Sequence, residues 1–245
     1  MQQGVTEALE GQPALSISGL TLRFGENTAV DDVSFAVAAG EIHGLIGHNG
    51  AGKSTVINML TGQLAPDAGV IELAGEAVRL RSRRAAQRQG IALVDQELSL
   101  VPALSIAENL RLGAPRSGSS ARMTAQRDRE LLERVGLADI ELAARVETLN
   151  LGQRQLVEIA RALGQGPRVM ILDEPTATLS ESESQFVYSA VRRVAAQGCA
   201  VIFVSHRLGE VLALCDRVTV LRDARLVGTR DTATSTVAEL KTVML

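Results

Sequence analysis

The sequence predicts an α/β fold built around a phosphate-binding loop, and three observations support this fold. The apolar run at residues 42–46 has the length and composition of a buried strand. A Gly-rich stretch at residues 47–55 follows, and residues 56–60 then have the pattern of the first turns of a helix. Two later apolar runs, at residues 169–172 and 200–204, are each followed by polar residues and are typical of buried strands. Ligands of such sheets bind at the carboxyl ends of the strands.

Residues 47–55 match the phosphate-binding pattern G-x-x-x-x-G-K-[ST] without a mismatch. The glycines permit backbone angles at which successive N–H groups converge on an anion, at the positive end of the following helix. Lys53 can then reach the outer phosphates, and the Ser54 hydroxyl can ligate magnesium. We therefore predict a nucleotide site made by nine residues: Gly47, His48, Asn49, Gly50, Ala51, Gly52, Lys53, Ser54 and Thr55.

Composition narrows the class of protein further. A chain of 245 residues is long enough for one α/β domain, or for such a domain with a smaller lobe. The net charge of −3 argues against a strongly basic, nucleic-acid-coating surface. Cys199 and Cys215 have no metal-ligand spacing, so we expect packing residues in a reducing cytoplasm.

No run approaches the about 18 apolar residues of a membrane span, and residues 1–13 lack a signal-peptide pattern. We expect a soluble chain whose membrane role, if any, comes from docking onto other subunits.

An antiparallel lobe is predicted ahead of the phosphate loop. Residues 14–23 and 32–38 alternate between apolar and polar, and the turn residues 25–27 lie between them. Phe24 lies beside this turn and outside any apolar run. Its ring is a candidate for stacking on adenine, and the alternative is that it caps the small lobe.

The next segment predicts two strands and a basic surface. Residues 70–73 and 91–95 are short apolar strands. Gln96 follows the second strand, where it could contact magnesium or water. A basic run between the strands is typical of a solvated helix face, with partner binding as the alternative. Its members are Arg79, Arg81, Arg83, Arg84 and Arg88.

The middle third predicts helices and no strands. Ser105 to Glu108 has the capping-box pattern of a helix start, residues 114–120 form a Pro/Gly/Ser loop, and residues 124–135 form a charged helix. Residues 149–153 precede an amphipathic helix, so their N–H groups could also meet an anion. We expect a helical subdomain inserted into the core.

Three polar residues at strand ends complete the candidate chemistry. Asp173 and Glu174 follow one buried strand, and charges there are costly unless they have a partner. The natural partner of Asp173 is a magnesium ion at Ser54, which leaves Glu174 to orient or deprotonate an attacking water. His206 follows the next strand, and in this company we expect it to contact the γ-phosphate rather than to be structural. The chain then predicts a hairpin, residues 218–221 with 226–229 at the sheet edge, and a short helix at residues 238–245.

These motifs, in this order, resemble the nucleotide-binding cassette of ATP-binding cassette (ABC) transporters from Ala14 to Leu245. Residues 47–55 correspond to Walker A, Gln96 to the Q-loop, and residues 149–153 to the signature. Residues 169–174 correspond to Walker B with the catalytic acid, and His206 to the switch histidine.

Several segments resemble the ATPases of monosaccharide importers in particular. They are residues 95–102, 105–110, 152–163 and 205–208. Such ATPases commonly fuse two cassettes in a chain of about twice this length. We therefore expect the N-terminal cassette, and a freestanding cassette that homodimerises is the alternative.

The resemblance implies one nucleotide-binding domain over residues 1–245 with a RecA-like P-loop NTPase core. Its parts would be an antiparallel β lobe (14–45), the core (40–96 and 166–245) and a helical subdomain with the signature (97–165).

The resemblance also implies roles for single residues. Phe24 would stack on adenine, and Ser54, Gln96 and Asp173 would arrange magnesium. Lys53, Gln96, Glu174 and His206 would form the catalytic set for ATP hydrolysis. Asn150, Gly152 and Gln153 would contact ATP held by a second cassette, fused or homodimeric.

The implied partners are membrane permease subunits at the loop after Gln96 and, indirectly, a periplasmic sugar-binding protein. The chain would lie peripherally on the cytoplasmic face of the inner membrane. It would power uptake of a monosaccharide, and a nucleoside or furanone signal is an alternative cargo.

Two departures from the family pattern favour a second hypothesis. Asn150 replaces the usual Ser of the signature, and Ser180 stands where many cassettes have Asp. A regulatory cassette that binds ATP with little hydrolysis is therefore an alternative. A third alternative is a soluble translation or repair ATPase, against which the acidic balance and the importer-like segments argue.

Overall fold

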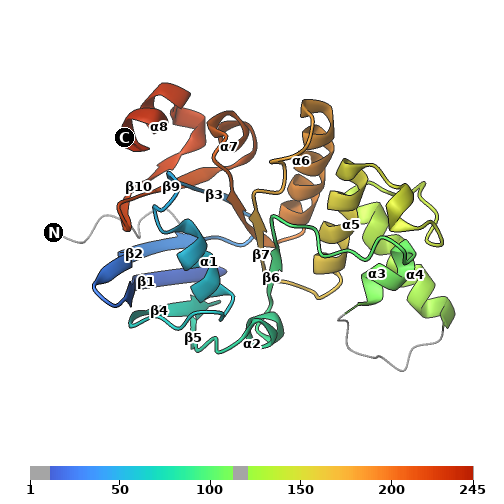
Figure 1. The fold of residues 1–245 in the computed structure, drawn as a ribbon, viewed down its shortest axis with the longest axis horizontal. Coiled ribbons are helices and arrows are strands. Elements are labelled where there is room, and N and C mark those ends of the chain that lie inside the picture. The colour runs from blue at the N-terminus through green and yellow to red at the C-terminus, as the bar shows by residue number, and fades with distance from the viewer. Residues whose placement is uncertain (1–11, 113–120, 245) are drawn as a thin grey trace.

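The structure is a computed structural model that describes residues 12–112 and 121–244, with backbone alone at residues 121–123 (Figure 1). The predicted loop at residues 114–120 lies outside the described residues, as do the first 11 residues. Among the described residues, no helix is both long and apolar enough to cross a membrane.

A six-stranded sheet forms the centre of the molecule, with the order β10-β9-β3-β8-β7-β6. All pairs among β9, β3, β8, β7 and β6 are parallel. At the edge, β10 pairs antiparallel with β9, which confirms the predicted hairpin. The bounds are β3 (Ile42–Ile46), β6 (Ile91–Val94), β7 (Val169–Asp173), β8 (Ala200–Val204), β9 (Arg217–Arg222) and β10 (Arg225–Asp231).

Both faces of this sheet are buried, and alternate residues of each strand point into different cores. In β7, Met170 and Leu172 pack in one apolar cluster, while Val169 and Ile171 pack in the other. This explains why the strands appear as continuous apolar runs in the sequence. The first cluster is shared with helices α5 (Leu151–Leu163), α6 (Glu181–Ala196), α7 (Leu208–Leu214) and α8 (Val237–Met244).

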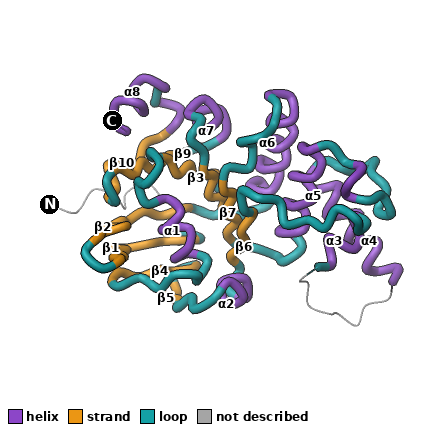
Figure 2. Tube along the Cα trace, in the orientation of Figure 1, coloured by secondary structure: helices purple, strands orange, loops and turns teal. Residues whose placement is uncertain are grey.

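A second, four-stranded antiparallel sheet has the order β2-β1-β4-β5 and packs with α1 (Lys53–Leu60) against the other face (Figure 2). The strands are β1 (Leu15–Phe24), β2 (Asn27–Val37), β4 (Ala68–Leu73) and β5 (Glu76–Val78). The structure corrects one boundary. The resemblance implies a core that includes residues 40–96, but β4 pairs with β1 and belongs to the lobe. The buried residues Ile71 and Leu73 show the period of a strand, and a period does not reveal which sheet the strand joins.

The helical part lies at one end of the molecule, on the right in Figure 1. It contains α3 (Ile106–Arg111), α4 (Ala121–Val135), the 3-10 turn η1 (Val146–Thr148) and α5. The predicted capping box at the start of α3 is confirmed, because Ser105 and Glu108 hydrogen bond reciprocally. An ion pair of 2.6 Å between Arg111 and Asp128 joins α3 to α4.

The basic run between β5 and β6 is a solvated surface, as predicted. All five of its arginines are exposed, although the helix, α2 (Arg83–Arg88), is shorter than the run. Arg83 makes an exposed ion pair with Asp95 at 2.9 Å.

A buried histidine that the sequence did not single out anchors the strand before the phosphate loop. His43, in β3, is 0% exposed. Its Nδ1 lies 2.8 Å from Glu41 Oε1, its Nε2 lies 2.7 Å from Thr219 Oγ1 of β9, and its ring stacks on Phe35. Burial opposes ionisation of Glu41, but the hydrogen bonds from His43 and from the Ala38 amide lower the pKa of Glu41 overall. This network ties β3 to β9 and to β2.

The two cysteines are buried packing residues, as the sequence predicts. Burial raises the pKa of the Cys199 thiol to about 11 and also raises the pKa of Cys215. We expect neither thiol of the native chain to react with Ellman's reagent within minutes at pH 8, and both to react in guanidinium. Rapid native labelling of either cysteine would contradict the packing described here.

Candidate active site

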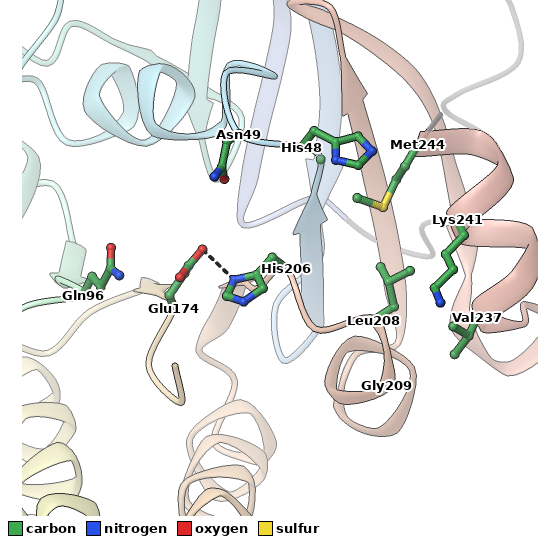
Figure 3. A pocket seen from close by; sticks show the side chains of 11 residues that line it. His48, Asn49, Gln96, Glu174, His206, Leu208, Gly209, Val237, Lys241 and Met244 are labelled. Atoms are coloured by element: carbon green, nitrogen blue, oxygen red, sulfur yellow. Dashed lines mark hydrogen bonds and ion pairs between the residues drawn. The ribbon is translucent and has the colours of Figure 1, made fainter. Parts of the chain in front are cut away.

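The carboxyl ends of four parallel strands meet at one cleft of about 1080 Å³. The phosphate loop follows β3, Gln96 follows β6, Glu174 follows β7 and His206 follows β8. Figure 3 shows side chains from all four segments around this cleft. Its lining residues are Gly47, His48, Asn49, Gln96, Glu174, His206, Leu208, Gly209, Val237, Lys241 and Met244.

The phosphate loop has the backbone that its glycines predict. Gly50 and Gly52 have φ angles of 84° and 104°, which side chains disfavour. Helix α1 begins at Lys53, three residues before the predicted start at residue 56, because Gly52 is its N-cap. No side chain caps this N-terminus, so the amides of the first turn remain available for an anion.

Gly47 is the most constrained glycine of the loop, and we expect Gly47→Ala to be damaging. A Cβ there would lie 2.4 Å from the carbonyl oxygen of Leu221. The expected cost is about 3 kcal/mol of stability, together with weaker nucleotide binding. At Gly50 a Cβ would have no atom within 4 Å, so Gly50→Ala carries the left-handed strain alone, about 1 kcal/mol. Thermal unfolding of both variants checks this difference, and equal losses would contradict it.

Lys53 is a buried residue that hydrogen bonds to the backbone of the phosphate loop. It is 8% exposed, and its Nζ donates to the carbonyl oxygens of Gly47 at 2.6 Å and His48 at 3.1 Å. Burial lowers the pKa of Lys53, while the negative charges of Glu174 and Asp173 oppose that shift. The ammonium group is therefore positioned between the loop and two carboxylates.

Asp173 and Glu174 have different environments although they are adjacent. Burial, and then the negative charges of Glu174 and Asp95, raise the pKa of Asp173, which Lys53 partly offsets. Glu174 has a φ of 48°, an uncommon angle for a residue with a side chain, and its N–H donates to the Val204 carbonyl at 3.0 Å. Strained backbone of this kind clusters at functional sites.

The structure brings Glu174 and His206 into contact. Glu174 Oε1 lies 3.0 Å from His206 Nδ1, and the dashed line in Figure 3 marks this interaction. Glu174 is largely buried, whereas the His206 side chain is 56% exposed. Gln96 lines the same cleft, as predicted.

The residues present fit a magnesium ion that shares its coordination with a phosphate. Among the described residues, no group of three or more His, Cys, Asp or Glu could cage a metal alone. Magnesium typically uses one or two carboxylates and completes its shell with phosphate and water. Asp173, whose burial disfavours its charge, and the exposed Ser54 hydroxyl at the start of α1 offer suitable oxygens.

Four predicted binding residues lie outside the four segments that meet at this cleft. Phe24 is 53% exposed at the end of β1 and is not among the lining residues. Asn150, Gly152 and Gln153 lie at the N-terminus of α5, in a separate cavity of about 340 Å³. Asn150 caps that helix, because its Oδ1 accepts from the Gln153 N–H at 2.8 Å and Gln153 Oε1 accepts from the Asn150 N–H at 3.1 Å. The predicted helix N-terminus is confirmed.

Other parts of the site were not foreseen. Lys241 and Met244 of α8, with Leu208 of α7, form a wall of the cleft. The sequence predicted the α8 helix but offered no signal for this role, because apolar helix residues are usually core. Ser180 proves to be the N-cap of α6, with Glu183 completing a capping box.

A family model described as ABC transporter matches residues 30–177, which include the phosphate loop, Gln96, Asp173 and Glu174. The chain belongs to the ABC transporter family. This ABC chain is 48% identical over 220 residues to the ribose import ATP-binding protein RbsA 1 of Rubrobacter xylanophilus, covering 89% of the chain and 44% of that protein. It is 46% identical over 231 residues to the arabinose import ATP-binding protein AraG of Azospirillum brasilense, covering 93% of the chain and 44% of that protein.

Solved structures confirm the predicted fold class of the ABC chain, a RecA-like P-loop core with an antiparallel lobe and a helical subdomain. The ADP conformation of MJ1267, an ATP-binding cassette of an ABC transporter, matches with a TM-score of 0.82 and 26% identity, over 95% of this chain and 94% of that one. The cbiO1 protein from Clostridium perfringens, part of the ABC transporter complex cbiONQ, matches with a TM-score of 0.82 and 25% identity, over 90% and 89%. The chain spans less than half the length of the curated sugar-import relatives.

Proposed function

We propose that this chain is the ATP-binding and ATP-hydrolysing subunit of a bacterial ABC importer that powers uptake of a monosaccharide through a membrane permease. The observation that supports it most strongly is the cleft that brings the phosphate loop, Gln96, Glu174 and His206 together. The names of the relatives, ribose and arabinose import ATP-binding proteins, support a sugar as the cargo.

The geometry suggests how the residues would act on ATP. Lys53 and the free amides of α1 would hold the phosphates, and Ser54, Asp173 and Gln96 would hold magnesium, which neutralises phosphate charge. Glu174 would orient a water molecule and accept its proton. Because His206 faces Glu174 through Nδ1, its Nε2 is left to steady the γ-phosphate. Phe24 would stack on adenine from the lobe.

A second cassette would complete the site. Asn150, Gly152 and Gln153 line a different cavity from the phosphate loop, so each cassette would supply them to ATP bound by its partner. The length of the relatives favours a second cassette fused to this one over a homodimer. Permease subunits would hold the pair on the cytoplasmic face of the membrane, and a periplasmic binding protein would deliver the sugar.

A regulatory cassette with little hydrolysis is the second candidate. Asn150 favours it, because its side-chain oxygen is already used to cap α5 and its amide nitrogen would have to replace the usual serine hydroxyl.

The experiment that tests the proposal is ATP turnover by the transporter assembled in lipid vesicles, with the sugar-binding protein present. We expect turnover that ribose or arabinose stimulates and that DNA and RNA leave unchanged. Tight ATP binding without turnover would favour the regulatory cassette. Stimulation by a nucleoside and not by sugars would indicate that the cargo is a nucleoside instead of a monosaccharide.

A further inference from the structure

One buried carboxylate, that of Glu210, is bonded to both loops that carry the Glu174–His206 pair. Glu210 lies in the first turn of α7 and is 6% exposed. Its Oε2 accepts hydrogen bonds from Thr176 Oγ1 at 2.7 Å and from Ser205 Oγ at 3.1 Å. Thr176 follows Glu174 by two residues, and Ser205 directly precedes His206. A single oxygen atom therefore joins the loop after β7 to the loop after β8.

The charge of this carboxylate is balanced locally. Glu210 Oε1 lies 2.5 Å from Arg207 Nη1. The Arg207 backbone N–H donates to Ser205 Oγ at 3.0 Å, and its Nη1 donates to the Thr176 carbonyl at 3.4 Å. Thr176 and Ser205 are 1% and 2% exposed, so water does not compete for their hydroxyls. Removing the carboxylate would leave buried donors without acceptors, which is costly.

The two loops depend on such side-chain bonds because strand pairing stops before them. The register of β7 and β8 ends at Asp173 opposite Val204, and the Glu174 N–H bond to Val204 closes it. Beyond this bond, among the described residues, the hydrogen bonds between the two loops involve side chains. The Glu174–His206 contact is one such bond, but it faces solvent. The bonds of Glu210 are buried and are therefore better placed to hold the loops.

We propose that Glu210 is a positioning residue that sets how Glu174 and His206 face each other and the bound nucleotide. It does not line the cleft and acts through Thr176 and Ser205. The proposal rests on the proposed function, because the pair it positions is the one that would act on ATP.

The first experiment measures loop order without nucleotide. Glu210→Gln keeps the shape of the side chain, but its one oxygen can face either Arg207 or the hydroxyls of Thr176 and Ser205, so one of these two sets of contacts is lost. We expect hydrogen exchange of the full chain to become at least about tenfold faster at the amides of Glu174 and Arg207. Glu108→Gln is the matched control, because Glu108 is also in the first turn of a short helix and bonds only locally to Ser105. It should leave exchange at both loops unchanged.

The second experiment measures turnover in the assembled transporter. Since a displacement of about 1 Å at a reacting group costs on the order of a hundredfold, Glu210→Gln should lower kcat at least tenfold while KM for ATP changes less than twofold. If Glu210 had a purely structural role, Glu210→Gln would lower thermal stability without lowering kcat selectively over KM for ATP. Thr176→Val removes the hydrogen bond from the Thr176 hydroxyl to Glu210 and provides the same readouts if Glu210→Gln does not fold.

Unchanged exchange at both loops, or unchanged kcat, would overturn the proposal. If the parent transporter does not hydrolyse ATP, the proposed function fails, and the exchange experiment still decides whether Glu210 holds the loops together.

Discussion

Glu174→Gln should abolish steady-state ATP hydrolysis while leaving ATP bound. The glutamine amide cannot accept a proton from water, so turnover should fall at least about a hundredfold, the usual loss for a general base. Its Oε1 can still meet His206 Nδ1, and its backbone can keep the φ of 48° at no new cost. Stability and ATP affinity should therefore be preserved, and an ATP-bound form should accumulate.

Phosphate release and retention of labelled ATP by the assembled transporter measure this outcome. Glu181→Gln is a suitable control, because Glu181 is an exposed residue in the first turn of α6 and does not line the cleft. It should leave turnover within about twofold, as ordinary surface substitutions do. Parent-like turnover of Glu174→Gln would remove Glu174 from the catalytic set.

Lys53→Met should abolish nucleotide binding without destabilising the chain. Each hydrogen bond to a charged group contributes about 1.5–3 kcal/mol, so loss of the contacts to two phosphates should weaken ATP binding at least a hundredfold. The free chain loses a buried ammonium whose pKa is lowered by burial and also loses its hydrogen bonds to the Gly47 and His48 carbonyls, so the two effects oppose each other and its stability should change little.

The sign of the pH effect follows from the same pKa. Between the lowered pKa of Lys53 and its ordinary value of 10.5, the unfolded chain binds more protons than the native chain, so the stability contribution of Lys53 rises with pH. Lys53→Met should remove that rise. Titration calorimetry and urea unfolding at several pH values test both expectations, and Lys241→Met, which changes the exposed lysine of the cleft wall, should have a much smaller effect on affinity. Equal losses for the two lysines would contradict the role of Lys53.

The sequence predicted best where local chemistry decides the structure. The strands β3 and β8 begin and end where the apolar runs do, and the capping pattern at Ser105 gives a real helix start. The motif at residues 47–55, with the polar residues after β6, β7 and β8, located the cleft correctly because carboxyl ends of parallel strands share one edge.

Long-range relationships could not be predicted in this way. The pairing of β4 with β1 depends on where the chain returns after α1, and alternation in β4 fits either sheet. The contacts of Glu210 with Thr176 and of His43 with Thr219 join residues that no periodicity connects. The α8 wall of the cleft depends on how a C-terminal helix packs over β9, which the composition of the helix does not reveal.

The position of β3 in the sheet has a consequence for synthesis of the chain on the ribosome. Both neighbours of β3, β8 and β9, come from the last fifth of the sequence, and His43 meets Thr219 across 176 residues. The strand that carries the phosphate loop emerges early and must therefore remain unpaired until residues 200–222 have been made. Nascent chains arrested before β9 should not retain ATP, and during that delay the apolar segment 42–46 is a natural client for chaperones.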